Sequence, residues 1–230
     1  MPTGRKIKIF VGSDPYMKKA EIALEFSIKM HASQPYEIVW MDHARGGAWA
    51  GWEIGREFGT LNSHAGWISD YECFRFAIPE MNHFEGRAIY LNVEMLFLGD
   101  IAELFNYPMT HPVYVPPRGM DVMLIDCAAF KGLPWWPTVD EMKKNGKRFW
   151  DYEKLMEEHH MIARKLPSKW ECMDGMGFDF DYTCAVHFAN LKTQPWKPYA
   201  DLVEYTEHPR SEIAELWWKS YKDALSKLLV

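Results

Sequence analysis

The sequence predicts a single α/β domain in which helices flank a mixed, mostly parallel central sheet. The chain begins with a strand–helix–strand pattern, and further short apolar strands alternate with helical segments after it. Its 230 residues are 48% hydrophobic and 15% aromatic, which is enough apolar material for one sizeable core. We therefore expect one domain over residues 1–230, with no linker that divides it.

The first unit is a parallel β-α-β unit. Residues 6–11 (K-I-K-I-F-V) form a strand pattern, and the turn residues 12–15 (G-S-D-P) end it. Apolar residues at helical spacing follow over 18–30, and the apolar residues 38–40 predict a second strand. Short connections of this kind imply a right-handed crossover.

A Gly- and Trp-rich stretch over 45–67 has no clean period and predicts a long ordered loop. Ser69 and Glu72 then have the spacing of a capping box, which predicts a helix from Asp70. Pro79 predicts that this helix ends at or before Ile78.

The remaining elements follow from short apolar runs and from helix boundary residues. We expect strands over 87–91, 112–115, 122–125 and 185–188, a helical turn within 96–105 after Gly99, and helices over 149–163 and from Ser211 to the C-terminus.

Charge and hydropathy exclude several classes of protein. The chain carries a net charge of −6, whereas nucleic-acid-binding proteins normally carry a basic excess. Its apolar runs fall far short of the roughly 20 residues that span a bilayer. No signal peptide is readable at the N-terminus, so we expect a cytoplasmic protein without a transmembrane segment. The sequence does not indicate an oligomeric state.

The strand over 87–91 runs into Asn92, Val93 and Glu94. Alternation along a strand would place the Asn92 and Glu94 side chains on the same side. Ligands of open α/β sheets bind beyond the carboxyl ends of strands, where two such oxygen-bearing groups can hold a divalent cation. A strand end that simply becomes polar in solvent explains the same spacing.

Ser13, Asp14 and Tyr16 follow the first strand and so lie at the equivalent edge. Tyr16 could stack on a nucleotide base while Asp14 accepts a hydrogen bond from the base or ribose. An Asx turn that caps the next helix is the ordinary alternative. Because the glycine motifs that bind phosphate are absent, a metal with Lys or Arg would have to neutralise a nucleotide's phosphates.

His187 follows a short apolar strand, and Lys192 lies five residues further on, before Pro195 and Trp196. This segment could supply an imidazole metal ligand and an ammonium group for phosphate. Isolated histidines are more often core or surface residues than ligands.

Taken in order, these segments resemble the family-8 glycosyltransferases, which have the GT-A fold. The resemblance runs from about residue 7 to 196, and its most specific stretch is G-R-A-I-Y-L-N-V-E-M-L-F-L-G-D-I-A-E-L-F at 86–105. It also includes K-I-F-V-G-S-D-P-Y, F-R-F-A-I-P-E, V-M-L-I-D, L-P-S-K-W-E-C-M-D and H-F-x5-Q-P-W.

The resemblance implies a retaining transferase that moves a sugar from a nucleotide-sugar, typically a UDP-sugar, to an acceptor hydroxyl. The acceptor could be a saccharide, a protein or a small molecule. Residues 6–105 would bind the nucleotide-sugar, residues 106–200 the acceptor and donor sugar, and residues 209–230 would form a C-terminal helix.

Individual roles follow from the same resemblance. Ser13, Asp14 and Tyr16 would hold the nucleoside, and Arg75 would lie near the diphosphate. Mn²⁺ or Mg²⁺ would assist departure of the diphosphate. The predicted metal ligands are Asn92 and Glu94, at the D-x-D positions, and His187.

Two further segments correspond to family motifs. Lys192 or Gln194 falls near a lysine that contacts the diphosphate in relatives, and Asp151, Tyr152 and Glu153 correspond to a D-Q-D segment that faces the donor sugar. We therefore expect Asp151 and Glu153 to be the catalytic carboxylates.

The chain departs from the family pattern at the metal motif, where N-V-E replaces D-x-D and removes one formal charge. This change leaves open a non-catalytic or metal-independent GT-A domain that binds a nucleotide-sugar or a partner. A nucleotidyltransferase or metal hydrolase would need a second carboxylate cluster, which has no well-spaced candidate in the sequence.

Overall fold

The computed structural model describes residues 6–52, 71–175 and 177–228. Its central sheet has six strands in the order β2-β1-β3-β6-β5-β7, and a smaller sheet has the order β4-β9-β8. The strands of the central sheet are β1 (Ile7–Gly12), β2 (Tyr36–Met41), β3 (Arg87–Asn92), β5 (Val113–Tyr114), β6 (Val122–Asp126) and β7 (Ile162–Ala163). Those of the smaller sheet are β4 (Met95–Phe97), β8 (Cys172–Met173) and β9 (Ala185–His187).

The central sheet is mixed but mostly parallel, as predicted. β1 is parallel to both β2 and β3, and β5 is parallel to β7. Only β6 runs the other way within this sheet, because it is antiparallel to β3 and to β5. The N-terminal end of β6 therefore lies at the same edge as the C-terminal ends of β1 and β3.

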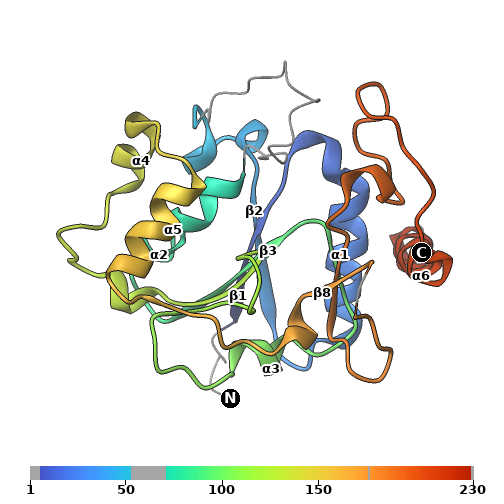
Figure 1. Ribbon diagram of the computed structural model, residues 1–230, viewed down its shortest axis with the longest axis horizontal. Helices are drawn as coiled ribbons and strands as arrows, with labels where there is room; N and C mark the ends of the chain where they lie inside the picture. Colours follow the sequence, from blue (N-terminus) through green and yellow to red (C-terminus); the bar gives the residue numbers. More distant parts are fainter. Residues whose placement is uncertain (1–5, 53–70, 176, 229–230) are drawn as a thin grey trace.

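Helices cover both faces of this sheet (Figure 1). On one side lies α1 (Lys18–His31), against which the C-terminal helix α6 (Ser211–Leu228) packs. On the other lie α2 (Ile78–Met81), α4 (Val139–Asn145) and α5 (Phe149–Glu158). The short helix α3 (Ile101–Phe105) follows β4.

Short 3-10 helices supply many of the connections. They span Pro15–Met17, His43–Arg45, Gly47–Trp49, Glu72–Ala77, Cys127–Phe130, Ser168–Trp170 and Leu191–Thr193.

The core forms where the sequence places its apolar runs. In β1, Ile7, Ile9 and Val11 have no exposed surface, and Leu24 and Ile28 are among the buried residues of α1. The Ser27 hydroxyl in α1 accepts a hydrogen bond from the N–H of Phe97 at 3.0 Å, which fixes β4 against this helix.

The predicted helix from Asp70 to Ile78 is wrong in its type and its end. Residues Glu72–Ala77 form a 3-10 helix that continues directly into α2, with Pro79 in the first turn of α2. Proline is tolerated there because the N–H that it lacks would have no partner within the helix. The predicted cap at Ser69 and Asp70, and the loop from residue 53 to 67, lie outside the described residues.

Another predicted helix is shorter than expected. The helix over 149–163 ends at Glu158, His160 has a φ of 54°, and residues 162–163 form β7 beside β5. The helical turn expected after Gly99 is present as α3, which Asp100 caps by accepting a hydrogen bond from the N–H of Ala102, whereas β4 at residues 95–97 was not predicted. The sequence analysis did not predict α4, although Thr138 and Glu141 have the spacing of a capping box, and it did not predict the two-residue strand β8. Within the described ranges, no helix is long and apolar enough to cross a membrane.

Candidate functional site

Polar side chains gather at the edge of the central sheet where β1 and β3 end. Gly12 pairs with Asn92 in the register of β1 and β3, and the N–H of Asn92 donates to the carbonyl of Asp121 at 2.9 Å. Asp121 directly precedes β6, whose start lies at this edge. The strand pairing thus brings Asp121 beside Asn92.

The smaller sheet brings a histidine and a glutamate to the same place. His187 ends β9, where it pairs with Met95 of β4 and Met173 of β8. Glu171 directly precedes β8, and the N–H of Phe188 donates to the carbonyl of Glu94 at 2.9 Å. Two chain segments thus meet beside His187.

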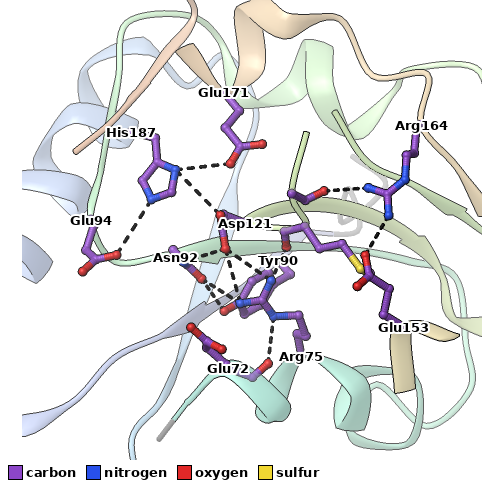
Figure 2. A network of polar contacts seen from close by, with 12 residues as sticks. Glu72, Arg75, Tyr90, Asn92, Glu94, Asp121, Glu153, Arg164, Glu171 and His187 are labelled. Carbon is purple, nitrogen blue, oxygen red and sulfur yellow. Dashed lines mark hydrogen bonds and ion pairs between the residues drawn. The ribbon is translucent and has the colours of Figure 1, made fainter. Parts of the chain in front are cut away.

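The imidazole of His187 lies among three carboxylates, as Figure 2 shows. Its Nδ1 atom is 3.2 Å from Glu171 Oε1 and 3.8 Å from Asp121 Oδ2, and its Nε2 atom is 3.8 Å from Glu94 Oε2. The side chains of His187 and Glu171 are almost fully buried. The site therefore concentrates ionisable groups away from solvent.

Burial and charge act against each other in this site. Burial alone would lower the pKa of His187, but its hydrogen bond to Glu171 and the nearby carboxylates of Glu94 and Asp121 outweigh it and raise that pKa well above the ordinary value. Burial raises the pKa of Glu171 to about 7. Burial would also raise the pKa of Asp121, but the charges of His187 and Arg75 lower it. When no metal ion is bound, these neighbours favour a protonated ring.

Arg75 is the second cation of the site, and its side chain is only 1% exposed. Its guanidinium donates to the carbonyls of Glu72 and Met120, and to Asn92 Oδ1 and Asp121 Oδ1. Its Cζ atom also lies 4.4 Å from the ring centroid of Tyr90. In this arrangement Arg75 contacts Asn92 and Asp121, and its place near a diphosphate stays a prediction.

Asn92 and Glu94 point to different partners. The strand ends at Asn92, and a turn separates it from β4, so the alternation expected over 92–94 is broken. Asn92 Oδ1 accepts hydrogen bonds from Arg75 and from the Tyr90 hydroxyl. Because both of these donors occupy the oxygen that would coordinate a cation, the arrangement does not fit Asn92 as a metal ligand.

Acidic and imidazole groups near Asn92 fit a cation better. One ligand atom each from Asp121, Glu171 and His187 lie within 4.8 Å of one another. Carboxylate oxygens with an imidazole nitrogen form a common donor set for divalent metals. His187 thus belongs to this group, whereas Glu94 faces the opposite ring nitrogen.

Gln194 and Lys192 lie near the end of this segment but differ in exposure. Gln194 is buried, and its Nε2 donates to Glu94 Oε1 at 2.9 Å and to the carbonyl of Phe188 at 3.0 Å. Lys192 is exposed in a short 3-10 helix. The structure therefore gives Gln194 the role of positioning Glu94, while a phosphate contact by Lys192 stays a prediction.

The residues after β1 form a second polar group at the sheet edge. Asp14 is buried, accepts a hydrogen bond from the N–H of Tyr16 at 2.8 Å, and accepts another from the Tyr199 hydroxyl. The Ser13 hydroxyl donates to Glu21 Oε1 at 2.7 Å. Tyr16 is 54% exposed, and its ring centroid lies 5.1 Å from that of Tyr199. Asp14 thus caps the next helix, and Tyr16 presents an aromatic surface to solvent.

The two predicted catalytic carboxylates both lie at the start of α5. Asp151 is exposed and accepts a hydrogen bond from the N–H of Arg148 at 2.8 Å, which caps the helix. Glu153 pairs with Arg164 at 2.7 Å, and Arg164 also donates to the carbonyl of Gly119. Figure 2 shows the Glu153–Arg164 pair in the same network of polar contacts as Asp121. Arg164 therefore links Glu153 to the loop that carries Asp121, whereas Asp151 caps its own helix.

Sequence reasoning missed Asp121 and Glu171. Both lie beside or within segments that carry the family resemblance: Asp121 directly precedes V-M-L-I-D, and Glu171 lies within L-P-S-K-W-E-C-M-D. For Asp121 the available signal was its position directly before the predicted strand over 122–125. Glu171 had no such signal, because no strand was predicted after it.

No family model matches this chain, and no curated protein matches it. Several solved structures are similar to this chain in fold. A structure of an active-site mutant of LgtC has a TM-score of 0.64 at 12% identity, covering 94% of this chain and 96% of that one. LgtC in complex with donor and acceptor sugar analogues has a TM-score of 0.61 at 13% identity, with the same coverage.

The bifunctional glycosyltransferase WbbM has a TM-score of 0.60 at 10% identity, and this chain spans about half of its length, 52%. The glycosyltransferase GlyE of Streptococcus pneumoniae TIGR4 has a TM-score of 0.56 at 13% identity over 98% of this chain and 63% of that one. The chain therefore has the fold of the GT-A glycosyltransferases.

Proposed function

We propose that this chain is a glycosyltransferase that moves a sugar from a nucleotide-sugar to an acceptor hydroxyl. The observation that carries the proposal is the cluster of buried ionisable groups at the carboxyl edge of the sheet, in a fold shared with LgtC over nearly the whole of both chains. Open α/β sheets bind their ligands at this edge. Because a fold alone hosts many functions, the proposal depends on these residues.

The residues after β1 support a nucleotide as the donor's leaving group. Buried Asp14, which already accepts hydrogen bonds from the Tyr16 N–H and the Tyr199 hydroxyl, is the acceptor that we expect beside a base or ribose. Exposed Tyr16 offers a ring for stacking. We expect Ser13 to orient this turn through Glu21. A UDP-sugar is the donor that we expect, following the resemblance to family 8.

Departure of a diphosphate requires positive charge near the breaking bond. A bound Mn²⁺ or Mg²⁺ would stabilise the negative charge on the leaving diphosphate. From this chain itself, His187 is the imidazole that we expect to bind the metal, and exposed Lys192 is the cation that we expect to contact phosphate.

We expect the transfer to retain the configuration at the sugar carbon, as in the family that the sequence resembles. Asp151 and Glu153, at the start of α5, are the carboxylates that we expect to face the donor sugar. Glu153 is held by Arg164 beside the loop that carries Asp121, which supports its place near the reacting groups.

Calorimetric titration with UDP, GDP, CDP and ADP, each with and without Mn²⁺, tests the proposal. We expect one diphosphate to bind more tightly than the others. The matching nucleotide-sugar is then incubated with the protein, and the nucleoside diphosphate that is released measures turnover, with water as the acceptor. Binding without turnover, even in the presence of a panel of acceptors, would identify a binding module, and failure of all four nucleotides to bind would contradict the transferase proposal.

A further inference from the structure

We infer that Asp121, Glu171 and the Nδ1 atom of His187 form a binding site for a divalent transition-metal cation, and that Glu94 supports this site without being a ligand. The sequence predicted Asn92, Glu94 and His187 as the ligands of the transferase's cation. The inference keeps His187 and replaces the other two ligands with Asp121 and Glu171. Its catalytic meaning rests on that proposed function, whereas the site itself rests on geometry.

The distances between the three donor groups suit a single ion. Metal–ligand bonds of about 2.1 Å at tetrahedral angles place ligand atoms about 3.4 Å apart. His187 Nδ1 lies 3.2 Å from Glu171 Oε1 and 3.8 Å from Asp121 Oδ2. These separations lie on either side of the expected value, so small side-chain movements would complete the site.

A buried oxygen without a partner supports the same conclusion. Among the described residues no donor reaches Oε2 of Glu171, although the side chain of this residue is 1% exposed. A buried polar atom left without a hydrogen bond costs about 1–3 kcal/mol. A cation bound by this carboxylate would remove that cost.

Gly119 leaves room on the side of both carboxylates. A Cβ atom at this position would lie 3.3 Å from Asp121 Oδ2 and 3.6 Å from Glu171 Oε1. The residue also has a φ of 74°, which favours glycine. The loop therefore carries no side chain where the two carboxylates meet.

The second nitrogen of His187 identifies the role of Glu94. A histidine that binds metal through one ring nitrogen usually donates the other N–H to a carboxylate, which fixes the tautomer. Here Nε2 faces Glu94 Oε2 at 3.8 Å, and Gln194 holds the other oxygen of Glu94 at 2.9 Å. Glu94 is thus a positioning residue that orients the ring.

The donor set favours Mn²⁺ or Zn²⁺. One imidazole nitrogen and two carboxylates suit these ions, whereas Mg²⁺ prefers oxygen ligands alone. The contrary arrangement is a network without metal, in which a protonated His187 alone balances the carboxylates. The two arrangements differ in whether the protein binds metal stoichiometrically.

The test is calorimetric titration of Mn²⁺, and separately Zn²⁺, into the full chain after treatment with a chelator and without nucleotide. We expect stoichiometric binding of at least one ion. Asp121→Asn and Glu171→Gln should each weaken it by more than about 100-fold, and Glu94→Gln by about 10–100-fold, the range typical of residues behind the ligands.

Asp174→Asn is the matched control, because Asp174 is also a buried carboxylate paired with a histidine, His208, at 2.9 Å. It should leave metal affinity unchanged. Pulsed EPR of bound Mn²⁺ should show nitrogen hyperfine coupling that His187→Gln removes. Far-UV circular dichroism and thermal denaturation identify variants that fail to fold, and a folded variant at either Asp121 or Glu171 is sufficient for the test.

The inference would be overturned if neither Mn²⁺ nor Zn²⁺ bound stoichiometrically at millimolar concentration. Unchanged affinity in folded Asp121→Asn and Glu171→Gln would also overturn it. Nucleotide titration with chelator present separates the two proposals: nucleotide binding without metal binding contradicts only the metal site, and metal binding without any nucleotide binding contradicts only the transferase.

Discussion

The Nη2 atom of Arg75 donates a hydrogen bond to Oδ1 of Asn92 at 3.2 Å. The Cζ atom of the guanidinium lies 4.4 Å from the ring centroid of Tyr90 and 5.0 Å from that of Phe149. Because these rings and several hydrogen bonds hold the cation, it orients the last residue of β3. Arg75 thus acts on the site through Asn92 and Asp121.

Replacing Arg75 with lysine tests this positioning role. Lysine keeps the charge but lacks the planar guanidinium. It could not bond at once to two backbone carbonyls and to the side chains of Asn92 and Asp121, as Arg75 does. We expect Arg75→Lys to lower the free energy of unfolding by about 2 kcal/mol or more, since several buried hydrogen bonds are lost. Urea denaturation measures this change.

The same variant distinguishes positioning from phosphate binding. If Arg75 acts through Asn92 and Asp121, Arg75→Lys should weaken the binding of uridine and of UDP by the same factor. A loss confined to UDP would show that Arg75 touches phosphate. Arg210→Lys is the control, because Arg210 forms an exposed pair with Glu212 and should change stability by less than about 0.5 kcal/mol.

Gly12 ends β1 where two buried tyrosines approach the backbone. A Cβ atom there would lie 2.5 Å from Tyr71 Cδ2 and 2.8 Å from the Tyr90 hydroxyl oxygen. Since neither ring has free space, we expect Gly12→Ala to lower the free energy of unfolding by about 1–3 kcal/mol. Urea denaturation measures it, with Gly175→Ala as the control because a Cβ at Gly175 meets no atom within 4 Å. Equal stability of the two variants would contradict the close approach.

Asp100 joins two distant segments, since its carboxylate accepts hydrogen bonds from the N–H groups of Ala102 and Ser33. Burial would raise its pKa, but these hydrogen bonds outweigh burial and lower it. A lowered folded-state pKa stabilises the protein above the unfolded pKa of about 3.9, and this stability is lost as pH falls through the folded-state pKa. The contribution is therefore fully present at neutral pH.

Asp100→Ala should lower the free energy of unfolding by about 1 kcal/mol at neutral pH, the usual value of a helix cap. Asp100→Asn retains an acceptor oxygen and is the matched control. The stability difference between wild type and Asp100→Asn should shrink as the pH falls from 5 to 3, measured by urea denaturation. A difference that is constant with pH would show that the charge contributes nothing.

Local sequence patterns predicted those elements that show a regular spacing of apolar residues and are bounded by turn residues. The β-α-β unit of β1, α1 and β2 is the example, because its apolar spacing and its turn at Pro15 both favour the same structure. β7 is the opposite case. Two residues, Ile162 and Ala163, form a strand only because β5, far away in sequence, offers hydrogen-bond partners.

The site was harder to predict than the fold, since its residues meet through long-range pairing. Asp121 reaches Asn92 because β6 pairs with β3, and Glu171 reaches His187 because β8 pairs with β9. No local pattern indicates these contacts. The burial of Arg75 was equally hidden, because an arginine in a short helical segment is usually exposed.

Tyr16 provides the sharpest test of where a nucleotide would bind. Its ring is 54% exposed and lies beside Tyr199, whose hydroxyl binds Asp14. Base–aromatic stacking contributes about 1–3 kcal/mol per base, so Tyr16→Ala should weaken UDP binding about tenfold or more, measured by calorimetry. Tyr16→Phe should keep the affinity, since it keeps the ring. Tyr182→Ala, which removes another exposed tyrosine, should change neither affinity nor thermal stability. If Tyr16→Ala binds UDP as the wild type does, the base does not lie on this ring, and the nucleoside site after β1 must be abandoned.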